Sequence, residues 1–385
     1  MATEPLKEAF AALVAGNTQQ AVQLFSQALA QTPENPDALL GLARTHLARR
    51  ALEEARAPLE KLVSLDPKHR EAQSHLAMLE ALAGDEDALQ QLRTLSGRPN
   101  AGFYEHFNLG LVLATLGELQ DAELALDRAI TAEPASLHAL MESGQLAMRR
   151  KDLPLAVRRF HAATVLAGNR SLPYALLSRA HHAKGERGKA LAALAEAIRR
   201  SPTERPLFEE LFKLCMEAGA TKQAAGAAAE LLRLDPKNAG YLVMQGEALR
   251  VAGRWEEARK AFLSAHELDP DGFAPTLGLG QVARATRDQE QAKIWLERAH
   301  STGTSDPRPA MELGGLLLEL GRESHAERVL MTAYAHRPED PRTNLLLARA
   351  LKTSDRSRAI AHARKAAKAT EPDLKDQAES LLREL

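Results

Sequence analysis

Apolar residues recur at helical spacing in consecutive segments that a glycine separates, for example Leu109, Val112, Leu113 and Leu116 before Gly117 and Leu119, Ala122 and Leu126 after it. Positions three or four apart lie on one face of a helix. The pattern therefore predicts pairs of short helices. Each pair has an apolar face that only a neighbouring pair can bury.

The pattern repeats with a period of 34 residues. An alanine is followed by a bulky residue, a small residue and a proline at fixed distances, as in Ala21, Phe25, Ala28 and Pro33 and again in Ala258, Phe262, Ala265 and Pro270. The repeats start at Ala2, Pro36, Arg70, Phe103, Leu137, Ser171, Arg205, Ala239, Phe273, Pro307 and Pro341. A period of this length is typical of stacked helical repeats.

The repeat resembles the tetratricopeptide repeat family, about eleven copies of which would cover nearly the whole chain. The family pattern has a small residue at position eight, such as Ala9, Gly110 and Gly144, and another at position twenty, such as Ala21, Ala122 and Ala156. It has a large residue at position twenty-four and a proline at position thirty-two. The resemblance implies an all-α fold: a right-handed superhelical α-solenoid of tandem helix-turn-helix units, closed by a C-terminal capping helix.

We expect three parts along the chain. Residues 2–99 form an N-terminal block of three repeats, residues 103–372 form a continuous block of eight, and residues 373–385 form the capping helix. The third repeat is one residue short and ends in the run of helix breakers from Ser96 to Gly102, which predicts either a bend or a tight loop.

Two repeats depart from the pattern inside their helices. Pro58 lies within a predicted second helix and predicts a kink. In the seventh repeat Phe212 is large where its relatives are small, and Ala228 is small where they are large, which predicts a compensating exchange of volume. Gly226, in the same repeat, marks either a soft joint or a closely packed position.

Composition and motifs indicate no enzyme. The chain holds no phosphate-binding glycine loop, no nucleophile with its base and no metal-spaced set of His and Cys, so we expect no cofactor and no metal. His181 and His182 are adjacent in a helix and point apart. The one cysteine, Cys215, falls at a usually buried position and can form no intramolecular disulfide. Without a secretion signal or a long apolar segment, a cytoplasmic location is expected.

The resemblance implies that an extended or helical partner segment lies on the concave surface, which the first helix of each pair lines. The candidate partner-binding residues in the fourth to sixth repeats are Tyr104, Phe107, Asn108, Leu111, Met141, Gln145, Met148, Leu172, Arg179 and His182. Exposed aromatic and Met side chains beside a few polar groups suit a peptide site. The alternative is that several of them belong to the core between repeats.

Positive charge is concentrated between Arg149 and Arg200, although the 50 basic and 51 acidic residues nearly balance. This basic belt suits either an acidic partner or a solvated outer face, and no interleaved aromatic residues support base stacking. The main hypothesis is a non-enzymatic scaffold for other proteins. A regulatory protein that binds a small effector is the alternative, and an RNA-binding array is a weaker one.

Overall fold

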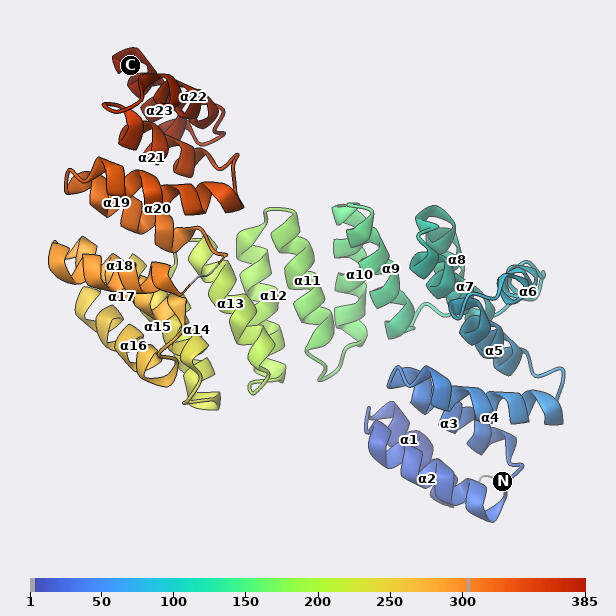
Figure 1. The fold of residues 1–385 in the computed structure, drawn as a ribbon. Coiled ribbons are helices and arrows are strands. Elements are labelled where there is room, and N and C mark those ends of the chain that lie inside the picture. The colour runs from blue at the N-terminus through green and yellow to red at the C-terminus, as the bar shows by residue number, and fades with distance from the viewer. Residues whose placement is uncertain (1–3, 303–304) are drawn as a thin grey trace. The chain divides into compact units, whose positions relative to one another are not determined.

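The computed structural model describes residues 4–302 and 305–385, which form helices and connecting turns with no strand (Figure 1). The chain divides into two compact units, Met1–Ser201 (unit 1) and Pro202–Leu385 (unit 2). The helices of unit 1 are α1 (Glu4–Val14), α2 (Thr18–Gln31), α3 (Pro36–Ala48), α4 (Leu52–Leu65), α5 (Arg70–Leu82), α6 (Glu86–Ser96), α7 (Phe103–Leu116), α8 (Leu119–Ala132), α9 (Leu137–Arg149), α10 (Leu153–Leu166), α11 (Leu172–Ala183) and α12 (Arg187–Arg200).

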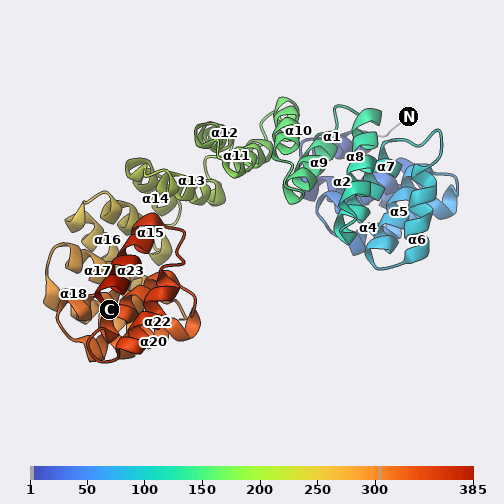
Figure 2. The ribbon, with the colours of Figure 1, turned by 90° about the horizontal axis from the view of Figure 1, so that it is seen from above.

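Unit 2 continues the same alternation of first and second helices, as both ribbon views show (Figures 1 and 2). Its helices are α13 (Arg205–Glu217), α14 (Thr221–Leu234), α15 (Ala239–Val251), α16 (Trp255–Leu268), α17 (Phe273–Ala285), α18 (Gln289–Ser301), α19 (Arg308–Glu319), α20 (Glu323–His336), α21 (Pro341–Leu351), α22 (Arg356–Ala366) and α23 (Pro372–Glu384). Each first helix packs against the second helix of its own pair. The fold is an all-α helical repeat solenoid.

The predicted register agrees with the helix boundaries. Eight first helices begin at the residue that the repeat predicts, from Pro36 of α3 to Pro341 of α21, and α11 and α19 begin one residue later. The start of the first repeat lies outside the described residues.

Small residues in the first helix face large residues in the second, and this complementarity holds each pair together. A Cβ atom added to Gly144 would lie 2.5 Å from the ring of Phe160, and one added to Gly246 would lie 2.7 Å from the ring of Phe262. These distances are shorter than carbon atoms tolerate, so the ring occupies the space that a side chain would need. Both rings are almost completely buried.

The turns within pairs use the left-handed conformation. The predicted turn glycines have positive φ, for example 88° at Gly117 and 74° at Gly253. Three pairs without such a glycine place Arg50, Lys151 or Arg287 in the same conformation, with φ between 58° and 62°. Glycine adopts this conformation without a steric clash of a Cβ atom, so the turns at these three residues have a higher conformational energy than a glycine turn.

The junction between the third and fourth repeats is well anchored. There α7 packs against α5 as well as against α6. Arg70 donates a hydrogen bond of 2.6 Å to the carbonyl of Asn100 and pairs with Glu105 at 2.5 Å. Ser96 Oγ lies 2.7 Å from His106 Nδ1, which ties the end of α6 to α7. These contacts favour the tight loop over a mobile hinge.

The two irregular repeats differ in part from expectation. Pro58 lies buried within α4, which remains one helix across it. Ala228 is fully buried, but Phe212 is only partly buried, so Phe212 fills less core volume than the exchange of sizes predicted. Gly226 is exposed, and a Cβ placed there would meet nothing within 4 Å, so close packing is not the reason for this glycine.

The last helix, α23, covers the final pair. It packs against α22 and α21 and buries Ala378 and Leu381. Two ion pairs fasten it, Arg342 with Glu371 at 2.7 Å and Lys352 with Glu384 at 2.6 Å. This placement is what a capping helix requires, because the last pair would otherwise expose its apolar face.

Candidate functional site

The predicted partner-binding residues lie on three first helices of unit 1. Tyr104, Phe107, Asn108 and Leu111 lie on α7, Met141, Gln145 and Met148 on α9, and Leu172, Arg179 and His182 on α11. Helices α7 and α9 contact each other, and α11 follows one repeat further along and packs against α10 and α12. We call the surface formed by the residues of α7 and α9 other than Asn108 the α7–α9 face.

The apolar residues of the α7–α9 face are partly buried. Phe107 and Leu111 pack against the core of the preceding repeats, and Met141 and Met148 pack against the core that contains Phe160. Each therefore has one side in the core and another in solvent. Leu172 is half exposed, Arg179 is exposed and His182 is partly buried.

Asn108 is a correction to the predicted set. Its side chain is fully buried. The amide nitrogen lies 2.9 Å from Ser74 Oγ and 3.0 Å from His75 Nδ1, both on α5. The close packing of α7 on α5 places this position inside the stack, so Asn108 joins two repeats and does not reach a partner.

Arg44 and Glu71 form a network beside Asn108 that the sequence analysis did not identify. The guanidinium of Arg44 on α3 donates two hydrogen bonds to the carboxylate of Glu71 on α5, at 2.6 and 2.7 Å. Glu71 also lies 3.4 Å from His75 Nε2. The ring of Tyr104 is 5.0 Å from that of His75 and 5.1 Å from the Arg44 guanidinium carbon. The network therefore holds Tyr104 in place.

Burial and neighbouring charges shift the pKa values of Glu71 and Tyr104 in this network. Burial alone would raise the pKa of Glu71, but the neighbouring His75 and the two hydrogen bonds from Arg44 lower it below the ordinary value. Burial raises the pKa of Tyr104, and the nearby Glu71 carboxylate raises it further. Glu71 is therefore ionised and paired, and Tyr104 is a neutral hydroxyl at physiological pH.

On α9, the residues His138, Met141, Glu142 and Gln145 are three or four positions apart or adjacent, so their side chains lie on one side of the helix. Burial raises the pKa of Glu142, and the charge of Arg50 offsets part of this effect. Burial also lowers the pKa of His138, so its imidazole is neutral at physiological pH. Protein atoms therefore surround this side of α9, although parts of it remain accessible to solvent.

A contact between distant segments explains why α9 is enclosed. Arg170, in the loop before α11, donates a hydrogen bond of 3.0 Å to the carbonyl of Val14 at the end of α1. The Arg50 side chain, in the turn between α3 and α4, is near enough to Glu142 to affect its titration. Unit 1 thus curls until its first repeats approach its fifth.

Polar contacts also join neighbouring first helices of unit 2. Arg284 on α17 pairs with Glu312 at 2.7 Å and with Glu319, both on α19. Tyr241 on α15 donates a hydrogen bond of 2.9 Å to Glu209 on α13. Charged groups here are matched to one another across neighbouring repeats, which leaves them less available to a partner.

Much of the basic belt is neutralised by ion pairs within unit 1. Its paired members are Arg150 with Glu123, Arg159 with Asp127, Lys184 and Lys189 with Glu186, and Arg199 and Arg200 with Glu196. Hydrogen bonds from Lys184 and His181 lower the pKa of Glu186 to about 2. These pairs favour the solvated outer face over a nucleic-acid surface, because paired cations release fewer counterions on binding phosphate.

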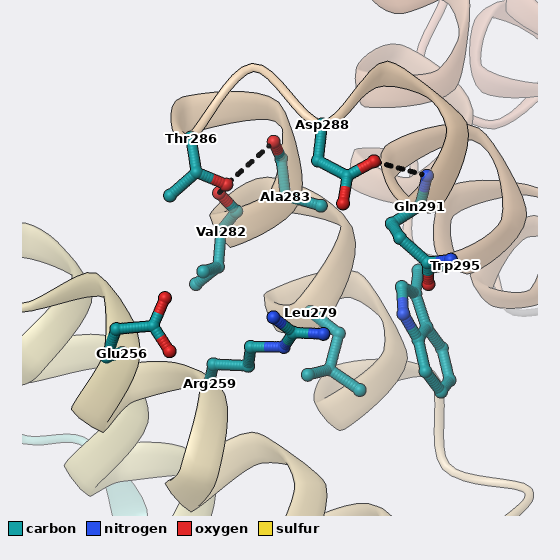
Figure 3. Close-up of a pocket in the computed structure, with 9 residues that line it drawn as sticks. All are labelled: Glu256, Arg259, Leu279, Val282, Ala283, Thr286, Asp288, Gln291 and Trp295. Atoms are coloured by element: carbon teal, nitrogen blue, oxygen red, sulfur yellow. Dashed lines mark hydrogen bonds between the residues drawn. The ribbon is translucent and has the colours of Figure 1, made fainter.

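A small hollow is lined by residues of α16, of the second half of α17 and of the start of α18 (Figure 3). It is lined by Leu279 and Val282 beside Trp295, is partly open to solvent and has space for little more than a water molecule. Thr286 donates to the carbonyls of Val282 and Ala283, and Asp288 accepts from the backbone nitrogen of Gln291. These polar groups end α17 and begin α18 within one repeat, and Glu256 and Arg259 come from α16 of the preceding repeat, so the hollow is a packing gap where two repeats meet.

Metal ligands and the cysteine thiol are the remaining candidates for chemistry in the described residues. No group of three or more His, Cys, Asp or Glu side chains is placed to hold a metal ion in residues 4–302 and 305–385. Cys215 is buried, and burial raises the pKa of its thiol. A thiolate is the reactive form of cysteine, so this environment disfavours a nucleophile.

None of the helices in the described part of the chain has the length and apolar character needed to cross a membrane.

Comparison with known proteins identifies the repeat. A model described as a tetratricopeptide repeat matches residues 12–94, and a second model of the same description matches residues 107–171, 210–275 and 243–307. A comparison with curated proteins finds no match.

Solved structures of similar fold support the same architecture. The chain resembles yeast Tom70 with a TM-score of 0.51 and 14% identity, over 99% of this chain and 94% of that one. It resembles a tetratricopeptide repeat protein from Parabacteroides merdae with a TM-score of 0.52 and 18% identity, over 64% of this chain and 97% of that one. At these identities the likeness concerns the fold alone.

Proposed function

The chain belongs to the tetratricopeptide repeat family, whose folds generally serve as protein interaction scaffolds, and from this premise we propose that it binds a segment of another protein on the α7–α9 face. In this proposal the protein is a non-enzymatic adaptor. The cytoplasmic location stays a prediction from the sequence.

The observation that carries the proposal is the half-buried apolar surface of α7 and α9. Phe107 and Leu111 on α7 lie one repeat from Met141 and Met148 on α9, and all four keep part of their side chains in solvent. Phe103 stacks on Phe107 with ring centroids 5.1 Å apart and limits its movement. Rigid aromatic and flexible Met groups lose little entropy on binding and bury much area, which favours affinity.

The network beneath Tyr104 supports the same surface. Its buried hydrogen bonds fix α7 against α5 before any partner arrives. A surface that is already ordered avoids much of the ordering cost of binding. In unit 2, ion pairs such as Arg284 with Glu312 join neighbouring first helices.

The test compares proteins captured from the native lysate by the full chain and by the double variant Phe107→Ala/Met141→Ala. Neither residue belongs to the network that joins α5 and α7. The matched control is Leu124→Ala, an apolar residue on the second helix α8 that is 59% exposed. A partner bound by the wild type and the control, and lost with the double variant, supports the proposal.

A second variant guards against a change in folding. Leu172→Asp alters a side chain that is 50% exposed and belongs to no core cluster of the described residues. If both altered proteins keep the wild-type circular dichroism and retain every wild-type partner, the α7–α9 face and its extension to α11 are not the binding surface.

A further inference from the structure

Two carboxylates on the first helices of unit 1 form ion pairs, and a third, that of Glu142, forms none with the described residues. The carboxylate of Glu71 is held by Arg44, and that of Glu105 is held by Arg70 at 2.5 Å. Glu142 makes no hydrogen bond or ion pair with any residue in the described part of the chain. Glu142 is thus a partly buried carboxylate for which the described residues provide no hydrogen-bond partner.

Glu142 lies on α9 beside the residues of the α7–α9 face. Met141 precedes it, and Gln145 follows one helical turn later on the same side of α9. Phe107 and Leu111 lie on α7, which contacts α9. An incoming segment that covers these apolar groups therefore brings its own side chains close to the Glu142 carboxylate.

Partial desolvation makes this carboxylate a strong acceptor for a cation. Water already reaches it less than it reaches a surface carboxylate, so a new ion pair costs less further desolvation. A hydrogen bond to a charged group in such surroundings contributes more than one in open solvent. A neutral or acidic side chain in the same place would leave the carboxylate unmatched.

On the basis of the proposed function, we propose that the partner segment presents a Lys or Arg side chain to Glu142 between apolar residues that cover Phe107, Leu111 and Met141. The face would thus select an amphipathic, cationic segment. Charge complementarity at one partly buried carboxylate, surrounded by apolar contacts, is the feature that identifies this class of partner.

Arg50 is the competing candidate for the same carboxylate. Its charge acts on Glu142 from the turn between α3 and α4, but no hydrogen bond joins the two side chains in the described structure. If Arg50 were the true partner, Glu142→Gln would loosen unit 1. If an external cation is the partner, the same substitution leaves the free protein as stable as the wild type or more stable, because it removes an unmatched charge.

The probe is a synthetic set of amphipathic peptides with fixed Leu, Phe and Met positions at helical spacing and one central position occupied by Lys, Arg, norleucine, Gln or Glu. Binding to the full chain is measured by fluorescence anisotropy. We expect the Lys and Arg peptides to bind roughly tenfold or more tightly than the norleucine peptide, since hydrogen bonds to charged groups contribute on the order of 1.5–3 kcal/mol.

The variant Glu142→Gln should remove this preference for a cation and leave the affinity for the norleucine peptide unchanged. The matched control is Glu86→Gln, an exposed carboxylate on α6 of the same unit, which should keep the wild-type preference. Equal binding of the Lys and norleucine peptides to the wild type, or an unchanged Lys preference in Glu142→Gln, would overturn the inference and leave the apolar binding surface intact. Failure of every peptide to bind would overturn the proposed function as well.

Discussion

The contact between Gly246 and Phe262 allows a direct test of the packing rule that builds each helix pair. The added methyl group of Gly246→Ala would lie 2.7 Å from Phe262 Cε1, so α15 or the ring must move. Overpacking of this kind costs about 1–3 kcal/mol. Helix propensity acts in the opposite direction, because Ala is favoured over Gly by about 1 kcal/mol within a helix. We expect a net destabilisation of about 0–2 kcal/mol.

Gly226→Ala is the matched control. Gly226 lies within α14 of the same unit, is exposed, and offers open space to an added Cβ atom. Only helix propensity acts there, so this variant should be more stable than the wild type by about 1 kcal/mol. The propensity contribution cancels when the two variants are compared. Their difference therefore isolates the contact with Phe262, at about 1–3 kcal/mol.

The assay is chemical denaturation of the full chain followed by far-UV circular dichroism, together with hydrogen exchange of the amides in α15 and α16. The second measurement is needed because stacked repeats can unfold in parts. Faster exchange in α15 and α16 of Gly246→Ala than of Gly226→Ala would support the reasoning. Equal stability of the two variants, or greater stability of Gly246→Ala, would refute it.

Three further predictions follow from burial and charge. Phe262→Ala should lower the free energy of unfolding by about 3–5 kcal/mol, and Phe212→Ala by less because its ring is only partly buried, which paired denaturation curves would check. Glu71→Gln should lower the free energy of unfolding most above pH 4.5, the ordinary pKa of glutamate. This destabilisation should shrink as the pH falls through the lowered pKa of Glu71, because the wild type then loses the same ion pair with Arg44. A destabilisation that grows in acid would contradict the prediction. Cys215 should react with a thiol reagent in the native protein far more slowly than in urea, and equal rates would show that its thiol is accessible.

The fold was predictable because its determinants are local. The residues that must fit each other, such as Gly144 and Phe160, belong to one helix pair and keep the same spacing in repeat after repeat. A glycine or another residue in left-handed conformation ends the first helix, and the second usually ends before a proline. A pattern that lies within one repeat period can be recognised in a single sequence.

The candidate site was less predictable because it depends on contacts between repeats. Asn108 is buried because α7 packs on α5 of the preceding repeat. Glu142 is near Arg50 because unit 1 curls, and no local pattern reports that curl. The ion pairs between first helices give no such signal, because Arg44 and Glu71 are 27 residues apart and Arg284 and Glu312 are 28, at different positions of the repeat.

The central claim is that a partner protein lies against the α7–α9 face, and site-specific photocrosslinking tests it most directly. A photoreactive amino acid replaces Gln145 on α9 in one protein and Leu124 on the second helix α8 in another, and each is irradiated in native lysate. The account predicts that a partner is crosslinked through position 145 and not through position 124, and that Phe107→Ala/Met141→Ala removes the crosslink. Crosslinking of the same partner only through position 124 would contradict it.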